Sequence, residues 1–516
     1  MKLTLERLQE KKAWKDAGYS LPAFDREKVR EATFKSPTWI HFGAGNIFRA
    51  FQANLLQTIL NAGKYDRGVI AVEGYDYEII EKMYWAHDNL SILATLKADG
   101  SVEKTVVGSV MESLLLDDTN ERQFQRLREI FANPSLQMAS FTITEKGYDV
   151  SRGNPYLEKV VALLYHRYQS GAFPLAMVSM DNCSHNGDRL REGITALVSD
   201  WCKKGQADDG FLHYVNSPVL SFPWTMIDKI TPRPDDKAKA LLAADRIEHL
   251  EQIVTSKNTY VAPFVNAEES EYLVIEDDFP NGRPPLERGG VIFTDRATVD
   301  KVEKMKVCTC LNPLHTALAI FGCLLGYDFI YEEMKDLSLR KLVETVGYKE
   351  GLPVVVNPGI LDPEKFLKEV LEVRIPNSFL PDTPQRIATD TSQKLAVRFG
   401  ETLKAYAADS RLQLSDLKAI PLVLAGWLRY LMGVDDNGKP FPISPDPLLD
   451  KLRPCVSSYG LEQPVTDFAP LRPILENKEI MEVNLYELGL ADVICEDFAQ
   501  LCDGTGAVRR TLERLL

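Results

Sequence analysis

The stretch PTWIHFGAGNIFRAFQANLLQTILNAG, residues 37–63, decides how the chain begins to fold. The apolar run 39–42 predicts a short buried strand, and the glycine-rich segment 43–45 predicts a tight turn. Periodic apolar positions then predict a helix closed by Gly63. A second apolar run, GVIAVEG at 68–74, predicts a neighbouring strand. Strand, helix and strand in this order form a βαβ unit, the building block of parallel α/β domains.

The glycine turn also predicts a dinucleotide site. Gly43 and Gly45 give the pattern GxG, with Phe48 at the third glycine position of GxGxxG, and Glu73 follows Gly45 by 28 residues. Glycines let backbone amides approach a pyrophosphate, and a carboxylate after the second strand accepts hydrogen bonds from the adenosine ribose and repels a 2′-phosphate. The predicted cofactor is therefore NAD. The residues predicted to bind it are Gly43, Ala44, Gly45, Asn46, Ile47, Phe48 and Glu73. The alternative is a tight turn that binds nothing.

After this βαβ unit, the pattern of strand and helix signals in the sequence changes once along the chain. Strand and helix signals alternate at 136–144, 155–169, 175–180 and 189–204, whereas helical periodicity dominates 300–325, 363–373, 391–408, 415–432 and 485–515. The segment 280–290 is rich in proline and glycine and marks a boundary. We expect an α/β protein: an N-terminal doubly wound Rossmann-type domain with an N-terminal extension over 1–295, followed by a mainly α-helical catalytic domain over 296–516.

Composition excludes several classes of function. The 516 residues carry a net charge of −14, which argues against nucleic acid as the main partner. The longest nearly uncharged apolar stretch, 316–327, is shorter than the about 20 residues of a membrane span. The charged N-terminus lacks a signal-peptide core, so a cytoplasmic location is expected. Eight cysteines and seven histidines form no CxxC or HxxxH pair, so no metal site is expected.

Polar residues in apolar surroundings are the candidates for chemistry. Lys306, Asn312 and His315 lie in or beside an apolar helical run, although burying an unpaired neutral polar group costs roughly 1–3 kcal/mol. Elsewhere, Asp181, Asn182 and His185 follow a predicted strand, Asp228 precedes a turn, and Arg386 and Lys394 are eight residues apart. Each of these three groups also has a structural interpretation, respectively an Asx turn, a solvated loop and a basic helix surface.

Together these segments resemble a known family. The motifs are GAGNIFRAF at 43, TEKGY at 144, DNCSHNG at 181, FPWTMIDKITP at 222, VIEDDFPNGRPP at 274, EKMK at 303, LNPLH at 311 and RIATDTSQKL at 386. In this order they resemble the polyol-specific long-chain dehydrogenases, the family of mannitol dehydrogenase and fructuronate reductase. The resemblance spans nearly the whole chain. It implies oxidation of a secondary alcohol to a ketone, with hydride passing to nicotinamide and no metal.

The resemblance also implies roles for individual residues. Lys306 matches the general base, a task for which burial must lower the ordinary lysine pKa of about 10.4. Asn182 and Asn312 match amides that donate to the developing alkoxide. Glu303 matches a carboxylate that relays protons to water. The residues that match positions around the substrate are His315, Asp228, Arg386 and Lys394.

One spacing departs from the family pattern. Asn312 follows Lys306 by six residues and His315 follows it by nine, in each case one more than is usual in the family. In an ideal helix this spacing would place Lys306 and His315 about 180° apart. We therefore predict a π-type bulge or a local break between Lys306 and Asn312, with Lys304 as the reserve candidate for the base.

The expected substrate is a small sugar acid or polyol. D-mannonate, oxidised to D-fructuronate, is favoured, and its carboxylate would pair with Arg386, Lys394 or Arg283. Mannitol and altronate are the alternatives within the family. A non-catalytic nicotinamide sensor is the alternative of another class. YEEMK at 331–335 matches the YxxxK of short-chain dehydrogenases, but it lies far too late in the chain. A monomer or a small homo-oligomer is expected.

Overall fold

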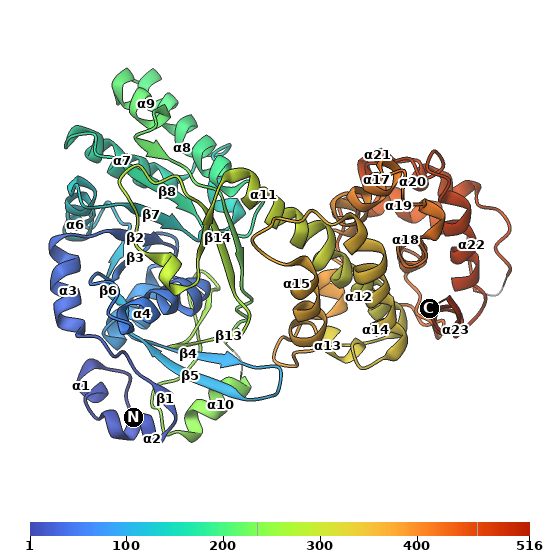
Figure 1. Cartoon of the computed structure of the whole chain (residues 1–516), viewed down its shortest axis with the longest axis horizontal. Helices are drawn as coiled ribbons and strands as arrows, with labels where there is room; N and C mark the ends of the chain where they lie inside the picture. Colours follow the sequence, from blue (N-terminus) through green and yellow to red (C-terminus); the bar gives the residue numbers. More distant parts are fainter. Residues whose placement is uncertain (235, 462, 516) are drawn as a thin grey trace. The chain divides into compact units, whose positions relative to one another are not determined.

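The computed structural model describes residues 1–234, 236–461 and 463–515. The chain divides into two compact units, unit 1 over Met1–Asp300 and unit 2 from Lys301 onward (Figure 1). The predicted domain boundary at 295/296 stays a prediction.

Unit 1 is built around a six-stranded parallel sheet with the order β6-β3-β2-β7-β8-β9. This is the doubly wound order, which reverses between β2 and β7 and binds ligands at the carboxyl ends of the strands beside that reversal. The strands are β2 (Trp39–Phe42), β3 (Val69–Glu73), β6 (Val110–Leu115), β7 (Met138–Phe141), β8 (Leu175–Ser179) and β9 (Leu220–Ser221). The predicted Rossmann-type fold is confirmed.

Alternation along the strands explains why helices cover both faces of this sheet. Val69 and Ala71 of β3 belong to one apolar cluster, whereas Ile70 and Val72 belong to another. The first cluster includes residues of α4, and the second includes residues of α6, α7 and α8. The helices of unit 1 are α1 (Leu5–Leu8), α2 (Lys11–Asp16), α3 (Arg26–Lys35), α4 (Ala53–Asn61), α5 (Tyr77–Ile79), α6 (Glu121–Ala132), α7 (Pro155–Gln169), α8 (Asn186–Lys203), α9 (Asp209–Asn216) and α10 (Asp236–Ala244).

Three smaller sheets in unit 1 were not predicted from the sequence. A four-stranded sheet has the order β1-β5-β4-β13, a three-stranded sheet has the order β10-β14-β15, and β11 pairs with β12. Their strands are β1 (Tyr19–Ser20), β4 (Ser91–Leu96), β5 (Val102–Val107), β10 (Thr225–Asp228), β11 (Ile253–Val254), β12 (Tyr260–Val261), β13 (Phe264–Glu268), β14 (Tyr272–Glu276) and β15 (Ile292–Thr294). Most of these strands are short, and several pair with segments far away in the sequence, so local patterns do not reveal them.

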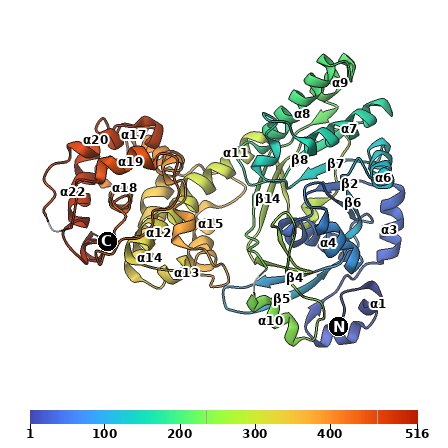
Figure 2. The same ribbon diagram turned by 180° about the vertical axis from the view of Figure 1, so that it is seen from behind.

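Unit 2 is mainly helical, as predicted, and no strand is assigned among its described residues (Figure 2). The buried helix α12 packs against α18, which in turn packs against α22. Helix α11 (Arg296–Lys304) contains the boundary between the units. The other helices are α12 (Asn312–Leu325), α13 (Ile330–Glu333), α14 (Leu337–Glu344), α15 (Pro363–Glu369), α16 (Pro384–Ile387), α17 (Glu401–Ala408), α18 (Ala419–Tyr430), α19 (Leu449–Val456), α20 (Arg472–Leu475), α21 (Lys478–Met481), α22 (Ala491–Leu501) and α23 (Ala507–Leu515).

Two helix predictions need correction. The segment 485–515 holds two helices, because Gly504 and Gly506 have φ of 82° and 74° and interrupt it. The segment 391–408 begins with a 3-10 turn and a π-helix at Ala396–Gly400 before α17. By length and composition, the helical segment Arg296–Leu325 could cross a membrane, but 78% of its apolar window is buried, as in the core helix of a soluble protein.

Candidate active site

The turn after β2 has the geometry that a phosphate-binding turn needs. Gly43 has φ of 104°, and a Cβ atom there would lie 2.2 Å from the carbonyl oxygen of Thr142, so only glycine fits. A Cβ atom on Gly45 would meet no heavy atom within 4 Å. The helix then starts with Asn46 and Ile47. The turn therefore borders open space at Gly45.

Phe48 explains why the third glycine of the fingerprint is missing. Its buried ring begins a π-helix, Phe48–Gln52, and stacks on His41 of β2 with ring centroids 4.2 Å apart. His41 is hydrogen-bonded through Nδ1 to Ser140 Oγ at 2.7 Å and through Nε2 to Thr142 Oγ1 at 2.9 Å. Burial lowers the pKa of His41 to about 3, so the ring is neutral. This histidine ties β2 to β7 beside the turn, and no local pattern in the sequence indicates it.

The Glu73 carboxylate lies at the end of β3 and is buried. Its Oε2 accepts the Ala44 amide at 2.9 Å, and its Oε1 accepts the amides of Gly74, Tyr75 and Asp76 at 3.1, 2.9 and 3.3 Å. Burial raises the pKa of Glu73, and these hydrogen bonds oppose that rise. Glu73 therefore holds the glycine turn against β3, and its predicted contact with a ribose stays a prediction.

Asp76 is a second carboxylate beside this turn. It is 2% exposed, and its Oδ2 accepts the Thr255 hydroxyl at 2.5 Å. Its Oδ1 has no hydrogen-bond partner among the described residues. An uncommitted buried acceptor is rare in folded proteins, and a bound water, ion or ligand can supply its donor. Only the position of Asp76, three residues after Glu73, could have indicated it from the sequence.

The loop that carries Asn182 follows β8 and is fixed at both ends. The Asp181 carboxylate accepts the amides of Ile143 and Thr144, both at 2.9 Å, and the Tyr148 hydroxyl at 2.5 Å. Burial raises the pKa of Asp181, and these three bonds oppose the rise. Thr144 has φ of 65°, a left-handed backbone that is strained for a residue other than glycine. These contacts hold the exposed Asn182 on a defined segment.

The other end of this loop is attached to β10. Asn186 donates to Thr225 Oγ1 at 2.8 Å, and its Oδ1 accepts the Thr225 amide at 3.0 Å. Asp228 ends the same strand and is 4% exposed. Hydrogen bonds therefore link the loop that carries Asn182 to β10, the strand that carries Asp228. His185 stacks on Trp224 with ring centroids 4.1 Å apart.

The chain around Lys306 contains the bulge that the spacing predicts. Residues Met305–Cys310 form a π-helix, and the Leu311 amide donates to the Lys306 carbonyl oxygen, five residues back, at 3.0 Å. A π turn accommodates one residue more than an α turn, so the inserted residue need not rotate Lys306 away from the next helix. The predicted π-type bulge is confirmed.

Burial separates the two lysines of this segment. Lys306 is 4% exposed, whereas Lys304 is exposed. Glu303 is half-buried one turn before Lys306. A base must lie where water does not compete for the substrate proton, so these positions favour Lys306 over Lys304.

Asn312 and His315 share the first turn of α12. Asn312 is half-buried, and its backbone carbonyl oxygen accepts the Thr316 hydroxyl at 3.1 Å. Burial lowers the pKa of His315 to about 4; Asp382 opposes this effect, and Arg374, Arg398 and Arg386 add to it. His315 is therefore a neutral imidazole that is influenced by the charges of one carboxylate and three arginines.

The two predicted basic residues of unit 2 differ in their partners. The Arg386 side chain is 63% exposed and forms an ion pair with Asp382. Lys394 donates to the backbone carbonyl groups of Ile387 and Thr389, and burial lowers its pKa. Two further arginines close to His315, Arg374 and Arg398, were not identified from the sequence.

Arg283 belongs to unit 1, where other groups occupy it. Its guanidinium pairs with Asp277 at 2.7 Å and with Glu287 at 2.6 Å, and it lies over the Phe293 ring at 3.4 Å from the centroid. Its charge is balanced by these two carboxylates. The predicted contact of Arg283 with a substrate carboxylate stays a prediction.

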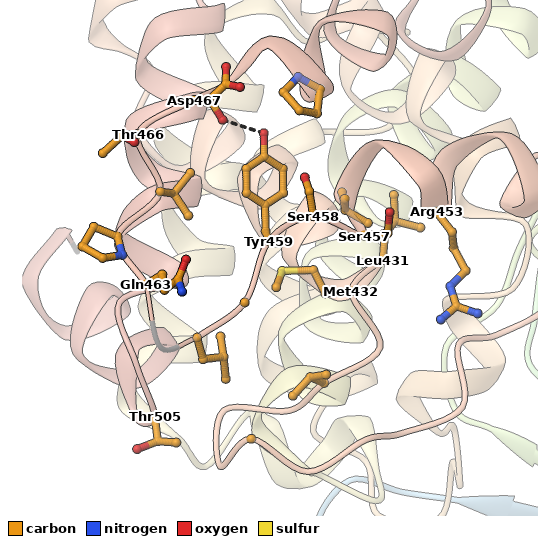
Figure 3. Close-up of a pocket in the computed structure, with 18 residues that line it drawn as sticks. Leu431, Met432, Arg453, Ser457, Ser458, Tyr459, Gln463, Thr466, Asp467 and Thr505 are labelled. Carbon is orange, nitrogen blue, oxygen red and sulfur yellow. Dashed lines mark hydrogen bonds between the residues drawn. The ribbon is translucent and has the colours of Figure 1, made fainter.

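A cavity of about 1100 Å³ in unit 2 lies between the segments 431–438 and 453–470 (Figure 3). Tyr459 lines it and donates its hydroxyl hydrogen to the carbonyl oxygen of Asp467 at 2.8 Å. Among the residues described around it, none is a predicted site residue. The predicted catalytic residues lie elsewhere, around Asn182 in unit 1 and around Lys306 in unit 2. In the described part of the chain, no group of three or more His, Cys, Asp or Glu side chains could hold a metal ion.

Two family models match most of the chain. The mannitol dehydrogenase Rossmann domain matches residues 37–288, and the mannitol dehydrogenase C-terminal domain matches residues 298–485. The D-mannonate oxidoreductase of Thermotoga maritima is 50% identical to this chain over 100% of it and 99% of the relative. The chain belongs to the mannitol dehydrogenase family.

More distant members of the mannitol dehydrogenase family align over most of their length. The mannitol 2-dehydrogenase of Aspergillus fumigatus is 27% identical over 88% of each chain. Among solved structures, a ternary complex of Pseudomonas fluorescens mannitol 2-dehydrogenase with NAD and D-mannitol has a TM-score of 0.69 at 25% identity, covering 100% of this chain and 99% of that one. A substrate-free D-sorbitol dehydrogenase has a TM-score of 0.76 at 22% identity and supports the fold, covering 95% of this chain and 97% of that one.

Proposed function

We propose that this chain is an NAD-dependent oxidoreductase that interconverts D-mannonate and D-fructuronate. The observation that carries the reaction is the π turn at Met305–Cys310, which absorbs one extra residue between the buried Lys306 and Asn312. The substrate is supported by the relative named D-mannonate oxidoreductase, which is 50% identical over the full length of this chain.

The residues around the glycine turn fit NAD. The open space at Gly45 leaves room for a pyrophosphate beside backbone amides, and the uncommitted Oδ1 of Asp76 leaves an acceptor for a ribose hydroxyl. The Pseudomonas fluorescens relative was solved with NAD. When bound, NAD supplies the acceptor for the substrate hydride.

The side chains of this chain would then manage the proton and the developing charge. Lys306 takes the hydroxyl proton as the general base, and Glu303 passes it on to water. Asn182 and Asn312 donate hydrogen bonds to the oxygen that becomes the ketone. His315, which is neutral because burial lowers its pKa to about 4, is suited to bind a substrate hydroxyl.

Two kinds of alternative function remain: another oxidoreductase of the same family, and a protein that binds nicotinamide without catalysis. Mannitol 2-dehydrogenase and altronate oxidoreductase use the same kind of site, and relatives named mannitol 2-dehydrogenase are 27% identical. His315 is influenced by the charges of three arginines and of one carboxylate, Asp382, and this excess of basic groups favours an acidic substrate over a neutral hexitol. A non-catalytic nicotinamide sensor would not need the buried Lys306 or the side-chain amides of Asn182 and Asn312.

The setting of the enzyme follows from the same proposal. A net charge of −14 and a small-molecule substrate suit a soluble cytoplasmic enzyme that binds neither nucleic acid nor membrane. We expect it to work as a monomer or a small homo-oligomer.

A substrate panel tests this proposal. Purified enzyme is mixed with NAD and D-mannonate, D-altronate or D-mannitol, and NADH formation is followed by absorbance. We expect the highest kcat/KM with D-mannonate. A higher kcat/KM with D-mannitol would assign the chain to the hexitol branch, and no NADH with any substrate would favour the sensor.

A further inference from the structure

Arg398 carries a charge that the described protein does not balance. It lies half-buried in the π-helix Ala396–Gly400, and its Nη1 donates to the hydroxyl oxygen of Thr316, a neutral group. Burial lowers the pKa of this guanidinium to about 10, and no carboxylate of the described residues opposes the effect. Burying an unpaired charge is costly, so the position of Arg398 indicates an anion that comes from outside the chain.

The surroundings of Arg398 connect it to the predicted substrate residues. Thr316, which accepts its hydrogen bond, follows His315 directly and donates to the carbonyl oxygen of Asn312 at 3.1 Å. Besides burial, the positive charge of Arg398 lowers the pKa of the His315 imidazole and the pKa of the Lys394 amine. Arg398 therefore belongs to the same group of side chains as the candidate amide and imidazole.

The other basic candidates are less suited to a substrate anion. Arg386 already pairs with Asp382, Arg283 already pairs with two carboxylates, and Lys394 donates to two backbone carbonyl groups. Arg398 donates one N–H to the hydroxyl oxygen of Thr316. The remaining N–H groups of its planar guanidinium match the two oxygens of a carboxylate.

We propose that Arg398 binds the carboxylate of the sugar-acid substrate and thereby selects aldonates over neutral polyols. This inference rests on the proposed function. The hydroxyl of Thr316 orients the guanidinium, so Thr316 is a positioning residue. The substrate carboxylate forms an ion pair with the Arg398 guanidinium. A neutral hexitol cannot form this ion pair.

The test compares two ligands that differ only in charge. The enzyme with NADH bound is titrated calorimetrically with D-mannonate and with D-mannonamide, its uncharged amide, using wild type, Arg398→Met, Thr316→Val and the control Arg411→Gln. Arg411 is an exposed arginine that pairs with Asp409. In wild type, D-mannonate should bind more tightly than the amide. Arg398→Met should weaken D-mannonate roughly ten- to hundredfold, the usual effect of losing a charge-assisted contact, and leave the amide nearly unchanged.

The remaining variants and a rescue separate specificity from misfolding. Thr316→Val should weaken D-mannonate by less than Arg398→Met, because the charge remains while its orientation is lost. Added guanidinium chloride should restore part of the D-mannonate binding of Arg398→Met, which it would not do for a misfolded protein. Arg411→Gln should bind both ligands like wild type.

The contrary results distinguish a wrong role for Arg398 from a wrong proposed function. Discrimination between D-mannonate and the amide that persists in Arg398→Met overturns the role of Arg398, and so does an equal loss for both ligands without rescue. Wild type that binds neither ligand, and oxidises no aldonate, overturns the proposed function instead.

Discussion

Replacing Gly43 by alanine tests whether the turn after β2 depends on a glycine. Its φ of 104° lies in the left-handed region, where a side chain costs roughly 1–2 kcal/mol. The new Cβ atom would also lie 2.2 Å from the Thr142 carbonyl oxygen, a backbone atom that cannot rotate away. Forcing such an overlap typically costs about 1–3 kcal/mol more. We therefore expect the free energy of unfolding of unit 1 to fall by about 2–5 kcal/mol.

Gly45→Ala is the matched control two residues further on. A Cβ atom at Gly45 meets no heavy atom within 4 Å, so thermal stability without cofactor should stay at the wild-type value. The added methyl group would instead fill the space that a pyrophosphate needs. We expect the Kd for NADH to rise roughly tenfold, equivalent to about 1.4 kcal/mol or one lost hydrogen bond.

The assay is thermal melting with and without NADH, combined with titration of NADH fluorescence. Gly43→Ala should melt at a lower temperature under both conditions and bind NADH weakly. Gly45→Ala should melt like wild type without NADH and gain less stability when NADH is added. Wild-type melting and NADH binding in Gly43→Ala would refute the argument, as would a loss of cofactor-free stability in Gly45→Ala.

Three further predictions concern the base, the cofactor and a buried acid. Lys306→Ala should lose nearly all turnover and keep NADH binding, because it removes only the proton acceptor, whereas Lys304→Ala should keep most turnover; steady-state kinetics and NADH titration check both. The kcat/KM for NAD should exceed that for NADP at least roughly tenfold, because the carboxylates of Glu73 and Asp76 repel a 2′-phosphate. Burial raises the pKa of Asp497 to about 7, with Glu496 adding to the rise, so the folded chain keeps a proton that the unfolded chain releases near pH 4. The free energy of unfolding should therefore fall as pH rises from about 4 to 7, and Asp497→Asn should remove that part of the slope in thermal melts across pH.

Each of these predictions has an outcome that contradicts it. Inactivity of Lys304→Ala together with an active Lys306→Ala would move the base to Lys304. Comparable kcat/KM for both cofactors would mean that the two carboxylates do not face the 2′ position. The same pH slope in wild type and Asp497→Asn would mean that this carboxyl group does not hold its proton in the folded chain.

The features that the sequence predicted are those that local patterns encode. The strand Trp39–Phe42 and the helix Pro155–Gln169 have the predicted bounds, because their apolar periodicity and their caps lie within the segment itself. The π turn at Met305–Cys310 was predictable because the spacing from Lys306 to Asn312 is one residue longer than in the family pattern that the sequence resembles, and a π turn absorbs one extra residue. A spacing in the sequence thus indicated a feature of the backbone.

The features that the sequence did not reveal depend on contacts between distant segments. Strand β10 pairs with β14, so that Thr225 lies opposite Ile275, and nothing near either residue announces the partner. The four amides that hold Glu73 converge only once the turn and β3 are in place. Arg398 looks like an ordinary helix-surface arginine in the sequence, and only its burial without a carboxylate partner distinguishes it.

The most direct test of the account is the fate of the hydrogen at the carbinol carbon of the substrate. D-mannonate that carries deuterium at the carbon that becomes the ketone is incubated with NAD and the enzyme, and the recovered NADH is weighed by mass spectrometry. We predict that the NADH formed by wild type contains the deuterium and that Lys306→Ala forms almost none. NADH without deuterium, or no NADH in the presence of wild type and D-mannonate, would contradict hydride transfer from this sugar acid.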